Sequence, residues 1–525
     1  MLKKVSLFLL ALLLVAAGVY LFRKQETKQS APAVAKTKEA AVASNGKALF
    51  ATYCAACHLL PQPQNLTKKV WKDGVLPMMA IRMGLQDEQY ERSISAEEKA
   101  VEEKNNLIPK TPMLSNEAFG EIRDYIISQA PDTIAYDVQR SQRSKPMRQF
   151  SRTDVQIEND GPSLITALQW NAENRTLWIG NLKSQVFNWR FDKGTAGPMN
   201  TTSAVVHFAF YNGNTFFTEV GELLPSELSK GAFAMAGNTK DVPILTGLHR
   251  PVHTVLEDFD GDKIPEIVAC NFGKNTGSLS LYKKEKSERL FTEQKLLPMP
   301  GATKCFVRDM NGDGKKDIVA LMAQGDESVY IFYNKDNIHF EAKRVLRFPP
   351  DYGTSDMVLA DYNNDGQLDL ITTHGDNADY SIILKAYHGI RIHLNQGDGT
   401  FKDAFFYPVY GVTRLLADDF DSDGDMDFAA TAFYPDYEAA LAESFLYLEN
   451  KDGKQFQFEA YTTTGFPIRS LTLEKGDVDG DGDIDIMLGN FAFSPVPAPT
   501  NVEAGWKAAP YGLILLLNNL KGTGR

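Results

Sequence analysis

The chain has 525 residues, of which 43% are hydrophobic, so it is long enough for at least two domains with a sizeable core. Its formal net charge of −12 is uneven: residues 1–45 hold seven Lys or Arg against two Glu, a net +5, which leaves −17 for the rest. This acidic remainder lacks the basic face that nucleic acid requires, which argues against that class of partner.

The N-terminus holds an uncharged apolar run of eighteen residues, "VSLFLLALLLVAAGVYLF", flanked by Lys4 and Arg23. Eighteen residues are enough to span a bilayer. A cleaved signal peptide has a shorter apolar region, of about 7 to 15 residues, followed closely by a small-residue site, whereas the small-residue "AVA" sites here begin only at Ala33 and Ala41. We therefore predict a retained membrane anchor over residues 1–24, with a cleaved signal as the alternative. The Ala-, Lys-, Thr- and Glu-rich residues 25–44 are predicted to be a flexible linker.

A cysteine pair followed by histidine comes next, in "FATYCAACH", which contains Cys54, Cys57 and His58. Such a pair can bind zinc, act as a redox dithiol or attach haem covalently. Zinc would need a second pair, but Cys270 and Cys305 lie more than 200 residues away, and a redox dithiol should follow a strand rather than a helical pattern. The motif therefore predicts one haem c, attached through both cysteines and ligated by His58. Since haem is attached outside the cytoplasm, the predicted location is extracytoplasmic.

The surroundings of this motif resemble a class I cytochrome c domain over residues 45–132. "GKALFATYCAACH" resembles its opening, and "SNEAFGEIRDYIISQAP" resembles its closing helix, with Ser115 as the N-terminal cap. The sixth iron ligand is sought among the methionines, whose thioether raises the iron's potential. Met79, in a predicted helix and turn, is most like the distal Met of short relatives. Met113 is the alternative because it precedes the last helix; Met78 and Met83 are further candidates.

Five acidic segments of nine residues then recur, and such repetition indicates a repeat architecture. Their first residues lie 51, 52, 58 and 58 positions apart. The segments are "DFDGDKIPE" from Asp258, "DMNGDGKKD" from Asp309, "DYNNDGQLD" from Asp361, "DFDSDGDMD" from Asp419 and "DVDGDGDID" from Asp477.

Oxygen side chains at loop positions 1, 3, 5 and 9, with a backbone carbonyl at position 7, can wrap a Ca²⁺ ion. A Gly at position 6 permits the turn in four loops; Lys263 replaces it in the first, which is predicted to be the weakest site. No loop has the Glu at position 12 that an EF-hand requires. The predicted ligands for up to five Ca²⁺ ions are Asp258, Asp260, Asp262 and Glu266; Asp309, Asn311, Asp313 and Asp317; Asp361, Asn363, Asp365 and Asp369; Asp419, Asp421, Asp423 and Asp427; Asp477, Asp479, Asp481 and Asp485.

Each loop is followed by a short apolar run typical of a buried strand, and a repeat of this length suits a four-stranded blade of a β-propeller. The repeats resemble the FG-GAP/VCBS type of integrin-like propellers, and the whole chain resembles bacterial VCBS-repeat proteins that carry an N-terminal cytochrome c. Two divergent blades around Leu164 and Val205 bring the count to seven. The last blade lacks an outer strand, which Met147–Glu158 is predicted to supply.

The predicted fold class is thus multidomain, with a small all-α cytochrome c domain followed by an all-β, seven-bladed propeller. The propeller covers residues 147–525, after a linker over residues 133–146. Nothing resembles a nucleophile elbow, a P-loop or a dinucleotide fingerprint. Cys270 and Cys305, in neighbouring blades, are either a disulfide or two buried thiols.

Two features of the propeller are candidates for binding. One residue per repeat, five positions before the first Asp, is predicted to lie at a common level of the central channel: His253, Lys304, Asp356, Arg414 and Thr472. Long insertions after second strands, from His374, Phe433 and Phe491, are predicted to gather on one face as a partner or substrate surface.

The sequence thus predicts a membrane-tethered, extracytoplasmic haem protein for electron transfer, with a calcium-stabilised propeller as binding scaffold. The alternative is an oxidoreductase whose substrate is oxidised in the propeller funnel, with electrons passing to the haem. A third reading is an adhesion module. The expected partners are a redox protein, a protein or carbohydrate ligand on the propeller face, and the membrane through the N-terminal helix. Whether the propeller is catalytic stays open.

Overall fold

The computed structural model describes residues 36–85, 94–135, 144–158, 161–237, 243–284, 290–336, 338–378, 381–465, 467, 469–509 and 511–520. Residues 1–45 and 46–525 form two compact units, and of the first only residues 36–45 are described. The predicted anchor, residues 1–24, lies outside the described residues and stays a prediction. Within them, no helix combines the length and the apolar character needed to cross a membrane.

Helix α2 (Lys36–Tyr53) begins inside the range expected to be a flexible linker, residues 25–44. Its sequence is rich in Ala and Lys, which are strong helix formers. The composition that suggested a tether therefore also supports a helix from Lys36 on, and residues 25–35 lie outside the described residues.

All regular elements described between residues 46 and 135, here called the helical module, are helical. Ser115 caps the last helix as predicted, its hydroxyl accepting a hydrogen bond from the Ala118 amide at 3.2 Å. Ile122 and Ile126, one turn apart on that helix, are buried against Phe50 and Trp71. After α2 the elements are η1 (Cys54–Ala56), η2 (Pro63–Asn65), α3 (Lys68–Val70), the π-helical η3 (Trp71–Val75), α4 (Leu76–Arg82), α6 (Ala96–Asn105) and α7 (Asn116–Gln129).

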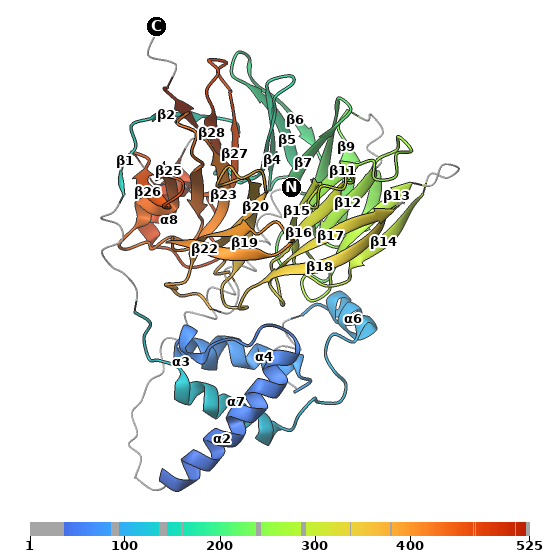
Figure 1. The fold of residues 1–525 in the computed structure, drawn as a ribbon, viewed down its shortest axis with the longest axis vertical. Coiled ribbons are helices and arrows are strands. Elements are labelled where there is room, and N and C mark those ends of the chain that lie inside the picture. The colour runs from blue at the N-terminus through green and yellow to red at the C-terminus, as the bar shows by residue number, and fades with distance from the viewer. Residues whose placement is uncertain are drawn as a thin grey trace. The chain divides into compact units, whose positions relative to one another are not determined.

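The described strands form seven sheets, each built on four antiparallel strands, so the predicted seven-bladed β-propeller is confirmed (Figure 1). In the first four blades the strands follow in chain order. They are β3 (Ile165–Asn171), β4 (Thr176–Asn181), β5 (Gln185–Arg190) and β6 (Gly194–Asn200); β7 (Val205–Tyr211), β8 (Asn214–Glu219), β9 (Gly231–Met235) and β10 (Leu245–Leu248); β11 (Pro251–Glu257), β12 (Glu266–Asn271), β13 (Ser278–Lys284) and β14 (Phe291–Leu297); β15 (Ala302–Arg308), β16 (Asp317–Met322), β17 (Ser328–Asp336) and β18 (His339–Arg347).

The last three blades follow the same plan, and two of them take a strand from before the first blade. Their strands are β19 (Thr354–Ala360), β20 (Asp369–His374), β21 (Gly389–Asn395) and β22 (Phe401–Pro408); β23 (Val412–Asp418), β24 (Asp427–Ala432), β25 (Phe445–Asp452), β26 (Gln457–Thr462) and β1 (Lys145–Pro146); β27 (Ser470–Gly476), β28 (Asp485–Asn490), β29 (Leu513–Asn518) and β2 (Phe150–Val155). The insertions of these blades carry η5 (Leu441–Ser444) and α8 (Thr500–Ala508).

The ring is closed by strand exchange between the two ends of the propeller, as predicted. Strand β2 pairs antiparallel with β29, from Phe150 opposite Asn518 to Val155 opposite Leu513. In Figure 1 the teal β2 lies in the same sheet as the brown-red β28. The two residues of β1 add a parallel partner to β26, which the sequence did not predict. Both additions cover sheet edges that would otherwise be open to other chains.

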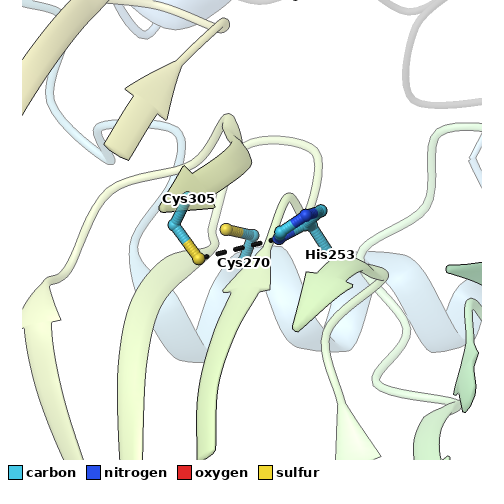
Figure 2. Close-up of side chains that lie close together, drawn as sticks. All are labelled: His253, Cys270 and Cys305. Atoms are coloured by element: carbon cyan, nitrogen blue, oxygen red, sulfur yellow. Dashed lines mark hydrogen bonds between the residues drawn. The ribbon is translucent and has the colours of Figure 1, made fainter. Parts of the chain in front are cut away.

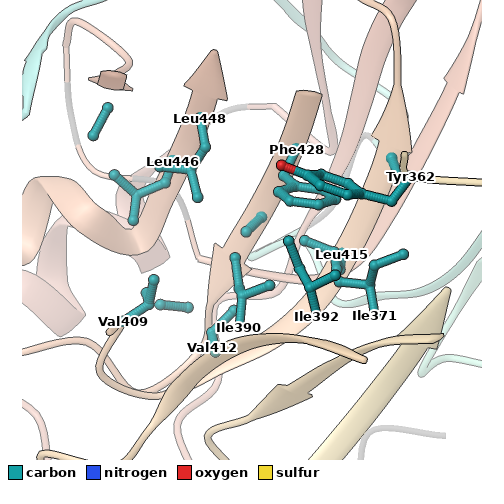
Figure 3. Packing of buried hydrophobic residues seen from close by; sticks show 14 residues of the cluster. Tyr362, Ile371, Ile390, Ile392, Val409, Val412, Leu415, Phe428, Leu446 and Leu448 are labelled. Carbon is teal, nitrogen blue, oxygen red and sulfur yellow. The ribbon is translucent and has the colours of Figure 1, made fainter. Parts of the chain in front are cut away.

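The predicted apolar runs after the loops are the second strands of their blades, and they are buried from end to end. Side chains alternate between the two faces of a strand. On β24, Phe428 and Ala430 pack with Ile392 of the blade before, while Ala429 packs with Ile486 of the blade after. Figure 3 shows the first of these interfaces, where the Tyr362 and Phe428 rings stack 6.1 Å apart. A strand buried on both faces needs a continuous apolar run, which is what the sequence has.

The closure can be tested by removing the largest side chain that β2 contributes to the core. Phe150 is 5% exposed and packs edge-on against Phe420 and Tyr447. We expect Phe150→Ala to lower the free energy of unfolding of the propeller by about 3–5 kcal/mol, measured by urea denaturation. The control is Thr153→Ala on the exposed side of the same strand, expected within about 0.5 kcal/mol of the wild type. Equal effects of the two changes would contradict the closure.

Candidate functional site

The cysteine and histidine motif lies where α2 ends. Cys54 begins the turn η1 and is half-buried against the core of the helical module, while Cys57 is exposed. Burial, with Cys57 as a second cause, raises the pKa of the Cys54 thiol to about 12. The Nδ1 atom of His58 lies 2.9 Å from the carbonyl oxygen of Leu59. A ring that donates from Nδ1 to this oxygen keeps the Nε2 lone pair for a metal.

The methionine candidates differ in exposure. Met79, on α4, is half-buried, whereas Met113 has 43% of its surface exposed. The Met113 amide donates to the Met83 carbonyl at 2.9 Å, and Met83 itself is buried in the core. Met83 is therefore accounted for by packing, and Met78, Met79 and Met113 remain the accessible thioethers. Two thiols, an imidazole and an accessible thioether make a donor set that fits a c-type haem in chemistry.

The acidic loops join the first strand of a blade to the second. Position 6 has a left-handed backbone in all five, which explains why four loops place Gly there. In the first loop Lys263 adopts the same conformation, which is strained for a side chain with a Cβ atom. The φ angles are +70° at Lys263, +81° at Gly314, +86° at Gly366, +95° at Gly424 and +91° at Gly482.

The position 9 carboxylate begins the second strand and is buried. In blade 6, Asp427 accepts hydrogen bonds from the Phe420 amide in its own loop at 3.1 Å and from the Asn450 amide on β25 at 2.7 Å. The sequence analysis predicted this residue only as a calcium ligand, but its hydrogen bonds also tie the loop to the third strand. The same pair of hydrogen bonds, one from the loop and one from the third strand, is accepted by Asp317, Asp369 and Asp485.

Several predicted ligands come together. In three loops, three carboxylates place one oxygen each within 4.8 Å of the others; these sets are Asp258, Asp260 and Asp262; Asp419, Asp421 and Asp427; Asp477, Asp479 and Asp485. In the remaining two loops, Asn311 and Asn363 donate to the carboxylates of Asp313 and Asp365 at 3.2 and 2.9 Å. Burial and the neighbouring carboxylates raise the pKa of Asp427 and of Asp485 to about 7.

The first acidic loop differs from the others in a second way. The ammonium of Lys283, on β13, makes an ion pair with Asp260, so a protein cation already neutralises part of this loop. The strained Lys263 and this contact favour a weak first site, whereas the close grouping of its three carboxylates does not, so the weakest-site expectation stays a prediction.

A central cavity of about 510 Å³ runs between the first strands of the blades. The five predicted channel residues, His253, Lys304, Asp356, Arg414 and Thr472, all line it. Each follows a register shift at the start of its strand, and the same shift recurs in the two divergent blades. Those blades contribute Ala167 and His207 at this level.

His207 was missed because the prediction counted back from an acidic loop, and its blade has none. The available signal was the shared Val-His at Val206-His207 and Val252-His253. Glu474 was missed as well, since it lies two residues beyond the predicted level; it lines the cavity, and burial raises its pKa to about 7.

Lys304, Asp356 and Arg414 bring two positive charges and one negative charge to this level of the cavity. The Lys304 ammonium lies 2.8 Å from Asp356, whose other oxygen accepts from the Leu415 amide at 3.1 Å. Burial, followed by the charges of Lys304 and Arg414, lowers the pKa of His207 to about 3 and that of His253 well below its usual value. Both imidazoles are therefore neutral, and the level keeps a net positive charge from Arg414.

The helical module contacts loops that lead into first and third strands. Asn65 donates to Asp351 at 2.7 Å and accepts from the Tyr387 hydroxyl at 3.2 Å, and Glu98 pairs with Lys274 at 3.7 Å. Tyr387 belongs to one of the three predicted insertions.

The other two insertions pack together, with the Phe433 and Phe491 rings 6.1 Å apart. Their cluster includes Leu223 of the second blade, so the two insertions join blades on both sides of the ring seam. Part of the expected partner surface is therefore covered by the chain itself.

The FG-GAP-like repeat family matches residues 258–320, 309–372 and 419–488. The chain therefore carries FG-GAP-like repeats, over the blades whose loops are acidic. No curated protein matches the chain.

Similar solved structures include the Pan2 WD40 domain of Neurospora crassa, at 12% identity and a TM-score of 0.43, covering 71% of this chain and 97% of that one. Another is Sqt1 of Saccharomyces cerevisiae, at 10% identity and a TM-score of 0.42, covering 70% and 99%. Because both TM-scores lie below 0.5, these likenesses carry no argument about function.

Proposed function

We propose that this chain is an extracytoplasmic c-type haem protein that transfers electrons, with the propeller as its binding scaffold. The observation that carries the proposal is the turn that presents Cys54, Cys57 and His58 together at the end of α2. A half-buried thiol, an exposed thiol and an imidazole in one turn suit attachment along one edge of a haem. The apolar core beside this turn, which includes Phe50 and Trp71, suits contact with the other edge of the haem.

In this proposal Cys54 and Cys57 would form the thioether bonds to haem, His58 would supply one iron ligand, and Met79 or Met113 would supply another. A haem bound there would carry one electron at a time. Exposure of Cys57 leaves the attachment turn open to solvent, which suits docking of a redox partner protein. The apolar run of residues 5–22 would tether the chain to the membrane.

We further propose that calcium stabilises the propeller through the acidic loops. The grouping of three carboxylates within 4.8 Å in three loops, and the left-handed position 6, support oxygen ligation of a hard cation. The buried position 9 carboxylate would connect the ion to the third strand, because it also accepts a hydrogen bond from a main-chain amide of that strand, as Asp427 does from Asn450. A bound ion would thus hold the loop and two strands of a blade together.

A second candidate function is oxidation of a substrate in the central cavity, with electrons passing to the haem. It is favoured by the neutral His207 and His253 and by Glu474, whose pKa of about 7 suits proton transfer near neutral pH. Reduction of the haem by an added small molecule, lost when the cavity is altered by Arg414→Met, would favour this function over electron transfer alone.

Haem attachment is the direct test of the proposed function. Cys54→Ala with Cys57→Ala should abolish haem staining on a denaturing gel, because no thiol is left beside His58 to form the thioether bonds. The matched control is Cys270→Ala with Cys305→Ala, two thiols of the propeller, which should keep the stain. Haem that stays covalently bound without Cys54 and Cys57 would end the proposal.

The axial ligand gives a separate prediction. We expect Met79→Ala to remove the near-infrared sulfur-to-iron band of the oxidised protein, since that band requires a thioether ligand. Met113→Ala is the paired variant, and it should leave the band in place. If the band survives in Met79→Ala and disappears in Met113→Ala, the ligand is Met113, whose side chain is 43% exposed in this structure.

Calcium removal should destabilise the propeller and leave the haem spectrum nearly unchanged. An ion that binds only the folded state stabilises it by about 2.7 kcal/mol per site at a hundredfold excess over Kd. Chelation should therefore lower the melting temperature strongly, measured by calorimetry, and Asp477→Ala with Asp481→Ala should reproduce part of the loss. Asp192→Ala, on an exposed turn of a blade without an acidic loop, is the control.

The first acidic loop allows a more specific test of calcium binding. Lys283→Met removes the ammonium that pairs with Asp260 and should raise the number of Ca²⁺ ions bound at low calcium. A melting curve that does not respond to chelator, in protein verified to be calcium-free after chelation, would mean that the loops are only solvated turns.

A further inference from the structure

Three soft-metal donors from two neighbouring blades meet in the wall of the central cavity. His253 lies on β11, Cys270 on the paired strand β12, and Cys305 on β15 of the next blade. One donor atom of each lies within 4.8 Å of the other two, and the Cys305 sulfur is 3.7 Å from His253 Nδ1. Figure 2 shows the three side chains close together, with the contact between the Cys305 sulfur and the His253 ring marked by the dashed line. Both thiols are free and fully buried.

The repeat does not require cysteine at either position. The residues at the register of Cys305 in the next blades are Met357 and Leu415, and those at the register of Cys270 are Leu321 and Thr373. Larger apolar or hydroxyl side chains therefore fill these places elsewhere in the ring. Two thiols beside an imidazole occur only in this blade pair among the described residues.

The charge around the three donors restricts what can bind. Lys304 and Arg414 lie near the histidines, so a cation held by neutral ligands would be repelled there. Two thiolates neutralise a divalent ion, and thiolate and imidazole donors select soft metals over calcium. His253 is neutral, as a metal ligand must be.

A fourth donor stands beside the three. The His207 ring lies 4.0 Å from that of His253, and its Nδ1 atom is buried without a hydrogen-bond partner among the described residues. His207, His253 and Cys305 all line the cavity, so water can also reach this side.

We propose that His253, Cys270 and Cys305 bind a thiophilic metal ion, Zn²⁺, with the fourth position on the cavity side taken by His207 or water. Binding releases the two thiol protons and transfers no electron. This site is separate from the acidic loops, whose donors are all oxygen. It would place a Lewis acid in the wall of the cavity, within reach of a bound molecule.

The test uses the full chain with its haem. Its thiols are kept reduced, and the protein is saturated with calcium so that the acidic loops are occupied. One equivalent of Zn²⁺ should stay bound through gel filtration, as measured by plasma mass spectrometry. The zinc X-ray absorption spectrum should show two sulfur neighbours at about 2.3 Å and nitrogen at about 2.0 Å. No retained zinc, or zinc with only oxygen and nitrogen neighbours, would overturn the proposal.

Variants assign the donors. Cys270→Ala, Cys305→Ala and His253→Gln should each lose the retained zinc, and His253→Gln, at the cavity wall, tests the site should the cysteine variants not fold. Met357→Ala, at the register of Cys305 in the next blade and equally buried, should keep it. Retained zinc in the two cysteine variants would overturn the proposal, as would a Cys270–Cys305 disulfide found by mass spectrometry in protein purified without reductant.

Discussion

A buried carboxylate at the start of the second strand holds each acidic loop to its blade. Burial of an ionised carboxylate is unfavourable unless hydrogen bonds replace its water. Asp427 meets this requirement with two main-chain amides, one from the loop and one from β25, and Tyr447 adds a hydroxyl donor at 2.8 Å. The loop cannot move away from the third strand without leaving this charge unsatisfied. The shape of the cation site is therefore set by the blade's own hydrogen bonds.

Much of the propeller could be predicted because its constraints are local and repeat. Each apolar run after a loop is buried on both faces, so it needs no alternation, and its fixed distance from the acidic loop gave the blade count. The missing outer strand could be predicted because an open edge at the ring seam is unfavourable. By contrast, β1 has only two residues and gives no periodic signal. The second role of position 9 was also missed, since the distance to the third strand varies from blade to blade.

Less of the candidate sites could be predicted, because they depend on residues brought together from different blades. His207 and His253 meet at one level through the shared register shift, which needs the sheet pairing to be known. The approach of Cys270 to Cys305 depends on the packing of one blade on the next, and sequence spacing left both a disulfide and two thiols open. The structure has two free thiols, with an imidazole beside them.

The acidic loops, predicted to bind calcium, and the helical module, predicted to bind haem, contact opposite ends of the strands of the blades. The acidic loops join first to second strands, while the helical module contacts loops that enter first and third strands, through Asn65 and Glu98. Neighbouring strands run antiparallel, so these two sets of loops are at opposite ends of every sheet. The insertion that holds Tyr387 is already engaged by the helical module. The helical module therefore contacts the propeller at the end of the blades opposite the acidic loops, and the central cavity is lined by basic side chains, Lys304 and Arg414, together with acidic ones, Asp356 and Glu474.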